Sequence, residues 1–347
     1  MNDAATVTEP LNPGHIMQTA TAFWGSKTLL TAVELDVFST LGAGPLTASQ
    51  LGERLGLHPR GTYDFFDALV ALGFLERQGD GPEGRYGNTL ETATFLDSSS
   101  PQYIGGMPKM LNARLFGFWN ELGTALKTGE PQNERRTEGR SMFEELYDDP
   151  IRLAEFLDAM TGFQAANFAL LADKFDFGRY QTVTDAGGAL ALLSRLVGAR
   201  HPHLRFSSFD LPKVSSLAET HVARAGMSDR IDVVSGDFFA DPLPRADVIT
   251  MGNILHDWNL DRKKQLIAKA YEALPEGGAL IAIENLIDDE RRENAFGLLM
   301  SLNMLIEFGD AFDYTAADYR SWCGEAGFQR FDVIPLAGPT SAAVAYK

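Results

Sequence analysis

Residues 181–188 read Q-T-V-T-D-A-G-G, and this stretch decides the fold of the chain. A segment rich in β-branched residues leads into Asp185 and then into the pair Gly187 and Gly188. β-Branched residues favour a strand, and glycines directly after it let the chain turn tightly and let a ligand approach the backbone at the next helix. The stretch therefore predicts the first strand-to-helix turn of a ligand-binding α/β sheet.

The same alternation continues toward the C-terminus. Strand patterns recur over residues 205–210, 231–237, 247–251 and 278–284. The intervening segments are helical in pattern and end near residues 195, 225 and 274. Strands that alternate with helices are typical of a doubly wound, Rossmann-like parallel sheet, whose ligands bind where the strands end.

Acidic residues stand at two of these strand ends. Asp210 closes the second strand and can accept hydrogen bonds from ribose hydroxyls, as in nucleotide-binding folds generally. Asp237 follows the third strand and can accept from an adenine amino group. Strand-end aspartates also serve turns, but the succession of Asp185, Asp210 and Asp237 favours an adenosine-containing ligand. The sequence has no Gly-Lys-Ser or Gly-Lys-Thr loop, which excludes ATP held by a P-loop.

His256 follows the strand at 247–251 and precedes a helix expected over 261–274. An imidazole with a pKa near ~6.5 can take a proton from a substrate at neutral pH. A histidine at a strand end is also a common structural hydrogen-bonding residue. Both interpretations are open from this position alone.

The N-terminal part has the pattern of a winged helix. Thr47 is a natural N-cap with Gln50 at the capping-box position, and Gly73 closes a helix expected over 61–72. Residues 74–77 and 85–88 then form a hairpin pattern. The helix at 61–72 carries two aspartates and no lysine or arginine, which argues against DNA binding and favours dimerisation.

Composition narrows the function further. The net charge of −17 disfavours nucleic acids and anionic membranes as partners, and no apolar run is long enough to span a bilayer. Cys323 is the only cysteine, so the chain can form neither an internal disulfide nor a thiolate metal cluster, and we expect no metal. The polar N-terminus resembles no secretion signal, so we expect a cytoplasmic protein.

Three regions are expected: a winged-helix-like domain over 1–100, a helical region over 101–175 and a Rossmann-like domain over 176–347. The helical region is rich in aromatic residues and methionine, which suits a pocket for a flat organic substrate. The candidates for substrate contact, including some from a later helix, are Phe116, Trp119, Met160, Phe163, Asn253, Met300, Asn303 and Met304.

Six segments together resemble a known family: residues 185–188, 209–212, 236–239, 253–258, 271–278 and 325–328. In this order they resemble the class I S-adenosylmethionine-dependent O-methyltransferases of the large dimeric type, which include the plant caffeate and acetylserotonin enzymes and many bacterial natural-product enzymes. The winged helix resembles the dimerisation domain of that family. The resemblance implies a homodimer formed through the N-terminal helices and methylation of a hydroxyl on an aromatic or polyketide-like small molecule.

The resemblance also assigns roles to residues. Gly187 would face the methionyl part of S-adenosylmethionine, and S-adenosylhomocysteine would be the product. His256 would be the general base, Glu284 would orient its imidazole, and Asp313 would be a second carboxylate in place of the usual glutamate. The residues implied to bind the cofactor are Asp185, Gly187, Gly188, Asp210 (ribose), Leu211, Asp237 and Phe238 (adenine), and Asn253.

Ala189 and Ala191 stand where the family's glycine motif has further glycines. If either position needs a positive φ, alanine costs on the order of 1 kcal/mol and weakens cofactor binding. Two alternatives therefore stay open beside O-methylation. One is a relative that methylates carbon or nitrogen, or uses the cofactor without methyl transfer. The other is a catalytically silent dimeric binding or regulatory protein.

Overall fold

The computed structural model describes residues 11–134 and 150–347, and by packing the chain divides into two compact units, residues 1–113 and 114–347. The three-part division with limits near residues 100 and 175 stays a prediction. The expectation that the chain has no secretion signal rests on its N-terminal segment. Most of that segment lies outside the described residues.

The first unit is mainly helical and carries a small antiparallel sheet in the order β1-β3-β2. Its core contains Phe38, Phe66 and Tyr86, all fully buried. Its elements are α1 (Gly14–Glu34), α2 (Val37–Leu41), β1 (Leu46–Thr47), α3 (Ala48–Arg54), α4 (Pro59–Ala71), β2 (Leu75–Gln78), β3 (Arg85–Asn88), α5 (Leu90–Phe95) and α6 (Gly106–Met110).

Local sequence signals explain these boundaries. Thr47 caps α3 in a full capping box with Gln50. Pro59 occupies the first turn of α4, and Gly73 after that helix has a φ of +82°. Strands β2 and β3 pair as the expected hairpin, with Leu75 opposite Asn88. The winged-helix pattern of helices and hairpin is thus present.

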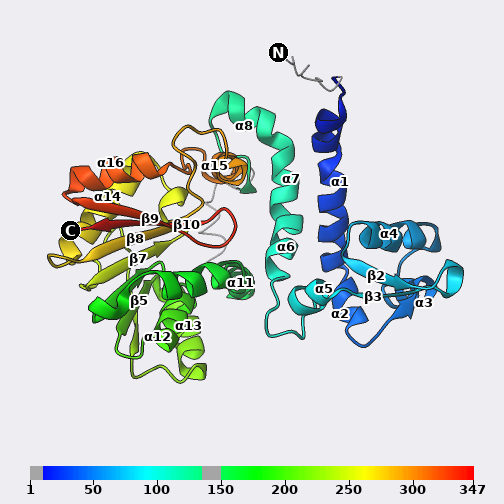
Figure 1. Ribbon diagram of the computed structural model, residues 1–347, viewed down its shortest axis with the longest axis horizontal. Helices are drawn as coiled ribbons and strands as arrows, with labels where there is room; N and C mark the ends of the chain where they lie inside the picture. The colour runs from blue at the N-terminus through cyan, green and yellow to red at the C-terminus, as the bar shows by residue number, and fades with distance from the viewer. Residues whose placement is uncertain (1–10, 135–149) are drawn as a thin grey trace, which may run out of the picture. The chain divides into compact units, whose positions relative to one another are not determined.

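The second unit is built on a seven-stranded sheet in the order β6-β5-β4-β7-β8-β10-β9 (Figure 1). The order steps outward in both directions from β4 and β7, as in a doubly wound sheet. The strands are β4 (Thr182–Ala186), β5 (Arg205–Asp210), β6 (Ile231–Ser235), β7 (Val248–Gly252), β8 (Ala279–Glu284), β9 (Arg330–Pro335) and β10 (Ser341–Tyr346).

The sheet is not wholly parallel. The five strands expected from the sequence, β4 to β8, pair in parallel, whereas β10 runs antiparallel to both β8 and β9. The parallel pairing expected for these five strands is confirmed, and the two further strands at this edge are not among those expected from the sequence. A two-strand hairpin at the C-terminus needs no crossover helix, which is why β10 inserts beside β8 in the opposite direction.

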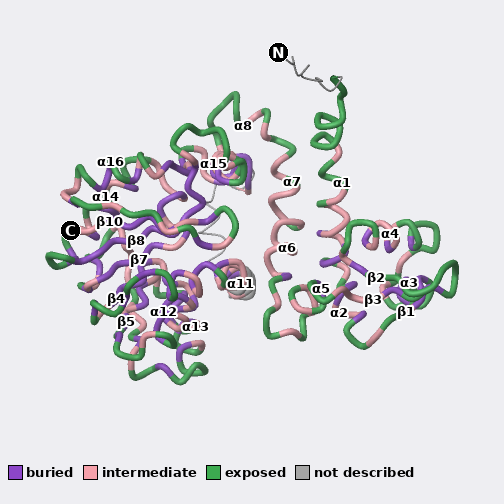
Figure 2. Tube along the Cα trace, viewed as in Figure 1, coloured by how far each residue is buried: buried purple, intermediate pink, exposed green. Residues whose placement is uncertain are grey.

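Helices cover both faces of the sheet (Figure 1). One face packs against α11 (Pro150–Lys174), α12 (Leu192–Arg200) and α13 (Pro212–Arg224), and the other against α14 (Leu260–Ala273) and α16 (Ala316–Ala326). Strand β8 is buried at every position, as expected for a central strand covered on both sides (Figure 2). Within residues 114–134 and 150–347, the further α-helices are α7 (Phe116–Phe118), α8 (Leu122–Thr128) and α15 (Ala295–Phe308).

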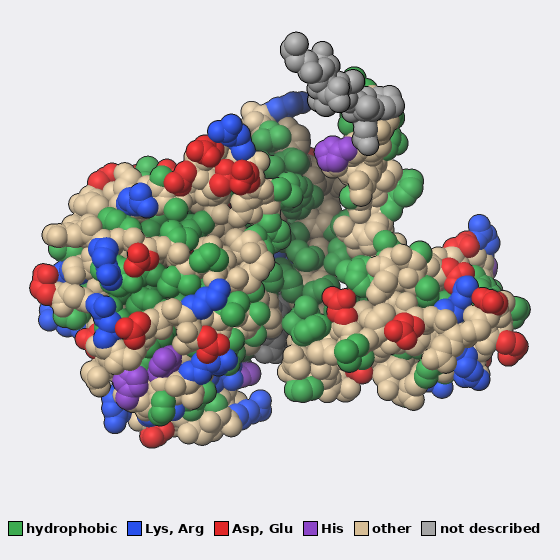
Figure 3. All heavy atoms as spheres, in the orientation of Figure 1, with side chains coloured by type: hydrophobic (Ala, Val, Ile, Leu, Met, Phe, Trp, Pro, Cys, Tyr) green, Lys and Arg blue, Asp and Glu red, His purple; other side chains and the backbone are tan. Residues whose placement is uncertain are grey.

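In the part of the chain that the structure describes, none of the helices combines the length and the apolar character that a bilayer crossing requires. Acidic and basic side chains are interspersed on the face shown in Figure 3.

Candidate functional site

The candidate site lies where β4 to β8 end. These parallel strands end at Ala186, Asp210, Ser235, Gly252 and Glu284, and their carboxyl ends therefore share one edge of the sheet. The candidate residues near those positions in the sequence are thus brought to the same edge. Ligands bind at this edge in open α/β sheets.

The turn after β4 is held against the end of β5. The backbone N–H groups of Gly187 and Gly188 donate to the carbonyl of Phe209, at 2.8 and 3.3 Å. The N–H of Ala189 donates to Asp210 Oδ2 at 2.8 Å. Gly187 has a φ of +76°, and Ala189 and Ala191 have φ of +45° and +56°. Both alanines thus occupy the left-handed region, in which glycine is favoured.

Two carboxyl groups flank this turn, the buried Asp185 and the half-buried Asp210. Asp185 accepts a hydrogen bond from Thr250 Oγ1 at 2.8 Å, and burial raises its pKa to about 7. Asp210 accepts from the N–H groups of Leu211 and Ala189. Burial raises the pKa of Asp210, and these two hydrogen bonds oppose the rise. Each oxygen of Asp210 accepts one hydrogen bond here, so the carboxylate keeps acceptor capacity for a ligand's hydroxyls.

The segment after β6 adds an acceptor and an apolar ring. Asp237 Oδ1 accepts from the N–H of Phe239, and both Asp237 and the neighbouring Phe238 are half-buried. The ring of Phe238 meets Phe239 and Trp258 edge to face, with centroids 4.8 and 6.0 Å away. Together with Asp210 and the half-buried Leu211, this edge offers carboxylates for hydroxyl or amino groups and an aromatic surface for a flat ring. These residues fit an adenosine group.

His256 lies in the short 3-10 helix η5 (Leu255–Asp257), between β7 and α14, and its side chain is buried among carboxylates. Its Nδ1 is 3.4 Å from Asp313 Oδ1 and 3.8 Å from Glu284 Oε2. Its Nε2 is 3.3 Å from Asp257 Oδ1. Glu284 also accepts, through Oε1, from the N–H groups of Leu255 and His256. The structure thus brings the three candidate catalytic residues together and adds Asp257.

The charges around His256 change its acidity. Burial lowers its pKa, but the negative charges of Glu284, Asp257 and Asp313 outweigh burial and raise the pKa to about 10. Burial raises the pKa of Glu284 to about 7 and that of Asp257 to about 6, against the opposing charge of the imidazole. The cluster therefore holds a proton on the imidazole at neutral pH.

The ligand atoms of His256, Glu284 and Asp313 all lie within 4.8 Å of one another, a spacing that a cation site could share. Carboxylate oxygens, however, face both ring nitrogens of His256. Negative charge on both sides of the ring favours the imidazolium ion, which carries a proton on each nitrogen. We therefore assign this cluster to proton binding.

Asn253 joins the strand-end turn to helix α11. Its φ is +53°, and its Oδ1 accepts from Gln164 Nε2 at 2.5 Å. Asn167 continues this contact by donating to Gln164 Oε1 and to Thr340 Oγ1, at 3.1 and 3.4 Å, and Thr340 donates to Asn285 Oδ1 at 2.9 Å. All five side chains are buried. This set, which we call the amide chain, connects α11 with the ends of β7 and β8 and the β9–β10 hairpin.

Apart from Asn253, the substrate candidates lie on four helical elements, α7, η3 (Trp119–Glu121), α11 and α15. Trp119, in the 3-10 helix η3, donates from Nε1 to Asn303 Oδ1 on α15 at 3.0 Å. Helix α15 packs against both η3 and η5, which places this pair on the helix beside His256. Asn303 and Met304 are buried, and the rest are half-buried and placed by their helices: Phe116 on α7, Met160 and Phe163 on α11, and Met300 on α15.

Sequence reasoning missed Asp257, Gln164 and Lys263. Asp257 adjoins the candidate histidine, and its position alone could have marked it. Gln164 lies within a helical pattern, in which nothing distinguishes a buried amide from an exposed one. Lys263 looks like an exposed lysine of an amphipathic helix, yet its side chain is fully buried.

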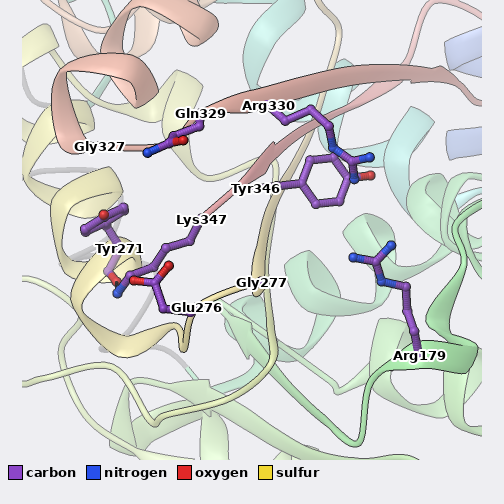
Figure 4. A pocket seen from close by; sticks show the side chains of 9 residues that line it. All are labelled: Arg179, Tyr271, Glu276, Gly277, Gly327, Gln329, Arg330, Tyr346 and Lys347. Carbon is purple, nitrogen blue, oxygen red and sulfur yellow. Dashed lines mark hydrogen bonds between the residues drawn. The ribbon is translucent and has the colours of Figure 1, made fainter.

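A cavity of about 360 Å³ lies elsewhere, beside the amino-terminal ends of β8 and β9 (Figure 4). It contains none of the candidate site residues. Its cationic side chains are already engaged: Lys347 Nζ donates to the carbonyls of Tyr271 and Leu274, and Arg330 stacks on the ring of Tyr346. Because it lies at the edge of the sheet opposite His256, we do not assign the chemistry to it.

Family models match most of the chain. A family model described as an O-methyltransferase domain matches residues 119–329, and one described as an O-methyltransferase dimerisation domain matches residues 17–98. The tetracenomycin polyketide synthesis 8-O-methyl transferase TcmO of Streptomyces glaucescens is 40% identical over 96% of this chain and 97% of its own.

Two further relatives widen the comparison. The N,N-dimethyltransferase OxyT of Streptomyces rimosus is 35% identical over 93% of each chain. The crystal structure of human N-acetylserotonin methyltransferase in complex with S-adenosylmethionine superimposes with a TM-score of 0.89 at 27% identity, over 98% of this chain and 99% of that one.

Proposed function

Because the chain belongs to the O-methyltransferase family and is an S-adenosylmethionine-dependent methyltransferase, we propose that it methylates a hydroxyl of an aromatic or polyketide-like small molecule with His256 as general base. One observation carries the proposal. The imidazole of His256 lies at the ligand-binding edge of the sheet, held by carboxylates and next to the helix that carries Asn303. Such an arrangement can accept a proton from a hydroxyl at the start of its attack.

The residues at the sheet edge fit the cofactor. When bound, S-adenosylmethionine supplies a methyl group on a sulfonium, which is electrophilic without a metal. In our proposal Gly187 and Gly188 present their backbone to the methionyl part, Asp210 accepts from the ribose, and Asp237 accepts from the adenine amino group. Phe238 packs on the adenine, and the remaining cofactor candidates, Asp185, Leu211 and Asn253, support these positions.

We assign the two imidazole nitrogens different roles. Nδ1 of His256 is fully buried and lies 3.4 Å from Asp313 Oδ1 and 3.8 Å from Glu284 Oε2, whose negative charges favour the protonated ring. Nε2 faces the half-buried Asp257 and is the nitrogen that receives the hydroxyl proton. Since the surrounding carboxylates raise the pKa of His256 to about 10, the ring must lose its resting proton first. Turnover should therefore rise with pH above neutrality.

Replacement of His256 tests the proposal. His256→Ala should lower kcat by roughly 10²–10⁴-fold, because the hydroxyl loses its base. Methyl transfer from a labelled donor to a panel of phenolic and polyketide-type acceptors measures it. Isothermal titration with S-adenosylhomocysteine should show unchanged cofactor affinity. His15→Ala, at an exposed position on α1, is the matched control. A His256→Ala enzyme with full turnover would refute the assignment.

The similarity to OxyT favours one alternative, transfer to nitrogen. The same base would serve an ammonium acceptor, so His256 does not separate the two reactions. The mass and fragmentation of the labelled product decide between a methoxy group and an N-methyl group.

Assembly is the second part of the proposal. The dimerisation-domain match runs from residue 17, within α1, to residue 98, beyond α5, and α1 exposes four large apolar side chains, those of Ile16, Met17, Phe23 and Trp24. Exposed apolar side chains on one helix mark a surface for protein contact. We therefore assign a homodimer to the chain, formed through its N-terminal helices.

A further inference from the structure

Lys263 is a buried cation that the proposed reaction does not use. It lies on α14, and its side chain has no exposed surface. Its Nζ donates to the carbonyl of Trp258, in the turn that carries His256. The same nitrogen lies 3.7 Å from the ring centroid of Phe312 and 5.8 Å from that of Tyr314. Fully buried lysines are rare because burial of an ammonium group is costly unless it is compensated.

The contacts of Lys263 connect the two sides of the site. Trp258 directly follows η5, which carries His256 and Asp257. Phe312 and Tyr314 flank Asp313, the carboxylate near the Nδ1 of His256. A hydrogen bond to one segment and a cation–π contact to the other hold these two segments at a fixed separation.

The charges around Lys263 are those of the site itself. Burial lowers its pKa to about 8, against the opposing effect of Glu284, Asp313, Asp257 and Asp310. Glu307 on α15 adds negative charge near Asp257 and is itself paired with Arg114. Lys263 is therefore a cation close enough to the carboxylates of the His256 cluster for their charges to act on it, and its contacts with Trp258 and Phe312 place it beside the segments that carry Asp257 and Asp313.

We propose that Lys263 is a positioning residue for methyl transfer: it braces the His256 turn against the Asp313 segment and offsets the negative charge that Asp257, Glu284 and Asp313 place around the imidazole. The inference rests on His256 acting as the base. Three carboxylates stabilise the imidazolium, which cannot accept a proton from the substrate. A nearby ammonium group opposes them and makes the neutral, active imidazole easier to reach.

Lys263→Met tests this role because methionine keeps the length and apolar character of the side chain and removes the charge. In 15N-histidine-labelled protein saturated with S-adenosylhomocysteine, the NMR titration of His256 should move upward by roughly one pH unit or more. The alkaline rise of kcat should move in the same direction, whereas the KM for S-adenosylmethionine should stay within about twofold. Lys263→Arg, which keeps the charge, should lie closer to the wild type.

Lys264→Met is the matched control. Lys264 is the neighbouring residue on α14, and its Nζ pairs with Glu325 at the surface, 2.7 Å away. This variant should leave both titrations unchanged. A folded Lys263→Met protein whose His256 titration and pH profile match the wild type would overturn the proposal.

Two further measurements separate the test of Lys263 from a failure of the variant to fold and from the test of His256 as the base. If Lys263→Met does not fold, 13C-lysine NMR of the wild type decides: an ammonium group at Lys263 that is already neutral below pH 7 overturns the inference, and one still charged there supports it. The His256 titration needs no turnover, so it reports on Lys263 even if His256→Ala stays active. Full activity of His256→Ala would refute the proposed base alone.

Discussion

Ala189 and Ala191 show how single residues set the conformation of the cofactor turn. Both have positive φ, a region that costs a residue with a Cβ about 1–2 kcal/mol. The turn keeps this conformation because Ala189 donates to Asp210 and the two glycines before it donate to Phe209. From the sequence, alanine at these positions is costly only if the backbone needs a positive φ. In the structure both positions have one.

We expect Ala189→Gly to raise the free energy of unfolding by about 1 kcal/mol, because glycine removes the left-handed strain at a half-buried position. Urea denaturation measures the change, and isothermal titration should show equal or tighter binding of S-adenosylmethionine.

The control is Ala199→Gly, at an exposed position in α12. There glycine should lower the free energy of unfolding by at most roughly 0.5–1 kcal/mol, because the position is helical and lies in the last turn of α12. Equal losses in both variants would show that Ala189 is not strained.

At the scale of elements, η5 places His256 where β8 and the segment before α16 supply carboxylates. The folded state therefore binds a proton on His256 more tightly than the unfolded chain does. A raised pKa of this kind stabilises the fold fully below pH ~6.5, and the stabilisation is lost as the pH rises through about 10. Lys263 has the opposite effect on stability, since burial lowers its pKa to about 8. The charged Lys263 destabilises the folded state, and this destabilisation is lost as the pH rises above that value.

The expected loss of stability as His256 loses its proton can be tested. Between pH 8.5 and 10 the His256→Gln variant should lose melting temperature less steeply than the wild type, because glutamine releases no proton. Thermal unfolding followed by circular dichroism measures both slopes. The surface variant His15→Gln should follow the wild type. Parallel curves for the wild type and His256→Gln would contradict a raised pKa at His256.

How much the sequence predicts depends on the range of the interaction. Thr47 with Gln50, Gly73 and the five parallel strands follow from local signals, because capping, turn chemistry and strand pattern act over a few residues. The juxtaposition of His256, Glu284 and Asp313 needed the family resemblance, since it joins residues distant in the chain. The sequence did not predict the burial of Gln164 and Lys263, because the burial of a polar residue in a helix depends on tertiary packing, which residue spacing does not reveal.

At the scale of the whole molecule, residues 1–113 carry the exposed apolar helix α1, and residues 114–347 carry the proposed reaction site. The apolar positions 16, 17, 23 and 24 of α1 lie on one side of the helix, since 16 and 23 are about two turns apart, 17 and 24 likewise, and neighbouring positions differ by about 100°. Gln18 lies on the other side by the same geometry. The catalytic cluster belongs entirely to the second unit.

We expect Trp24→Glu to convert a dimer into monomers, because it places a charge within the apolar side of α1. Sedimentation velocity across a concentration series measures the change. Gln18→Glu adds the same charge on the opposite side of α1 and should stay dimeric. If Trp24→Glu sediments as the wild type does, α1 is not the contact.

The amide chain has a consequence for how such an enzyme diversifies. Gln164 and Asn167 anchor one side of α11 to the strand-end turns, so substitutions elsewhere on that helix need not displace His256. Met160 and Phe163 on α11 make none of these hydrogen bonds, and Met300 lies on another helix, α15. Selection for new acceptors can therefore act on these side chains, whereas changes at Asn253 or Gln164 disturb every acceptor alike. The residues proposed to contact the acceptor can thus change while those that position His256 stay the same.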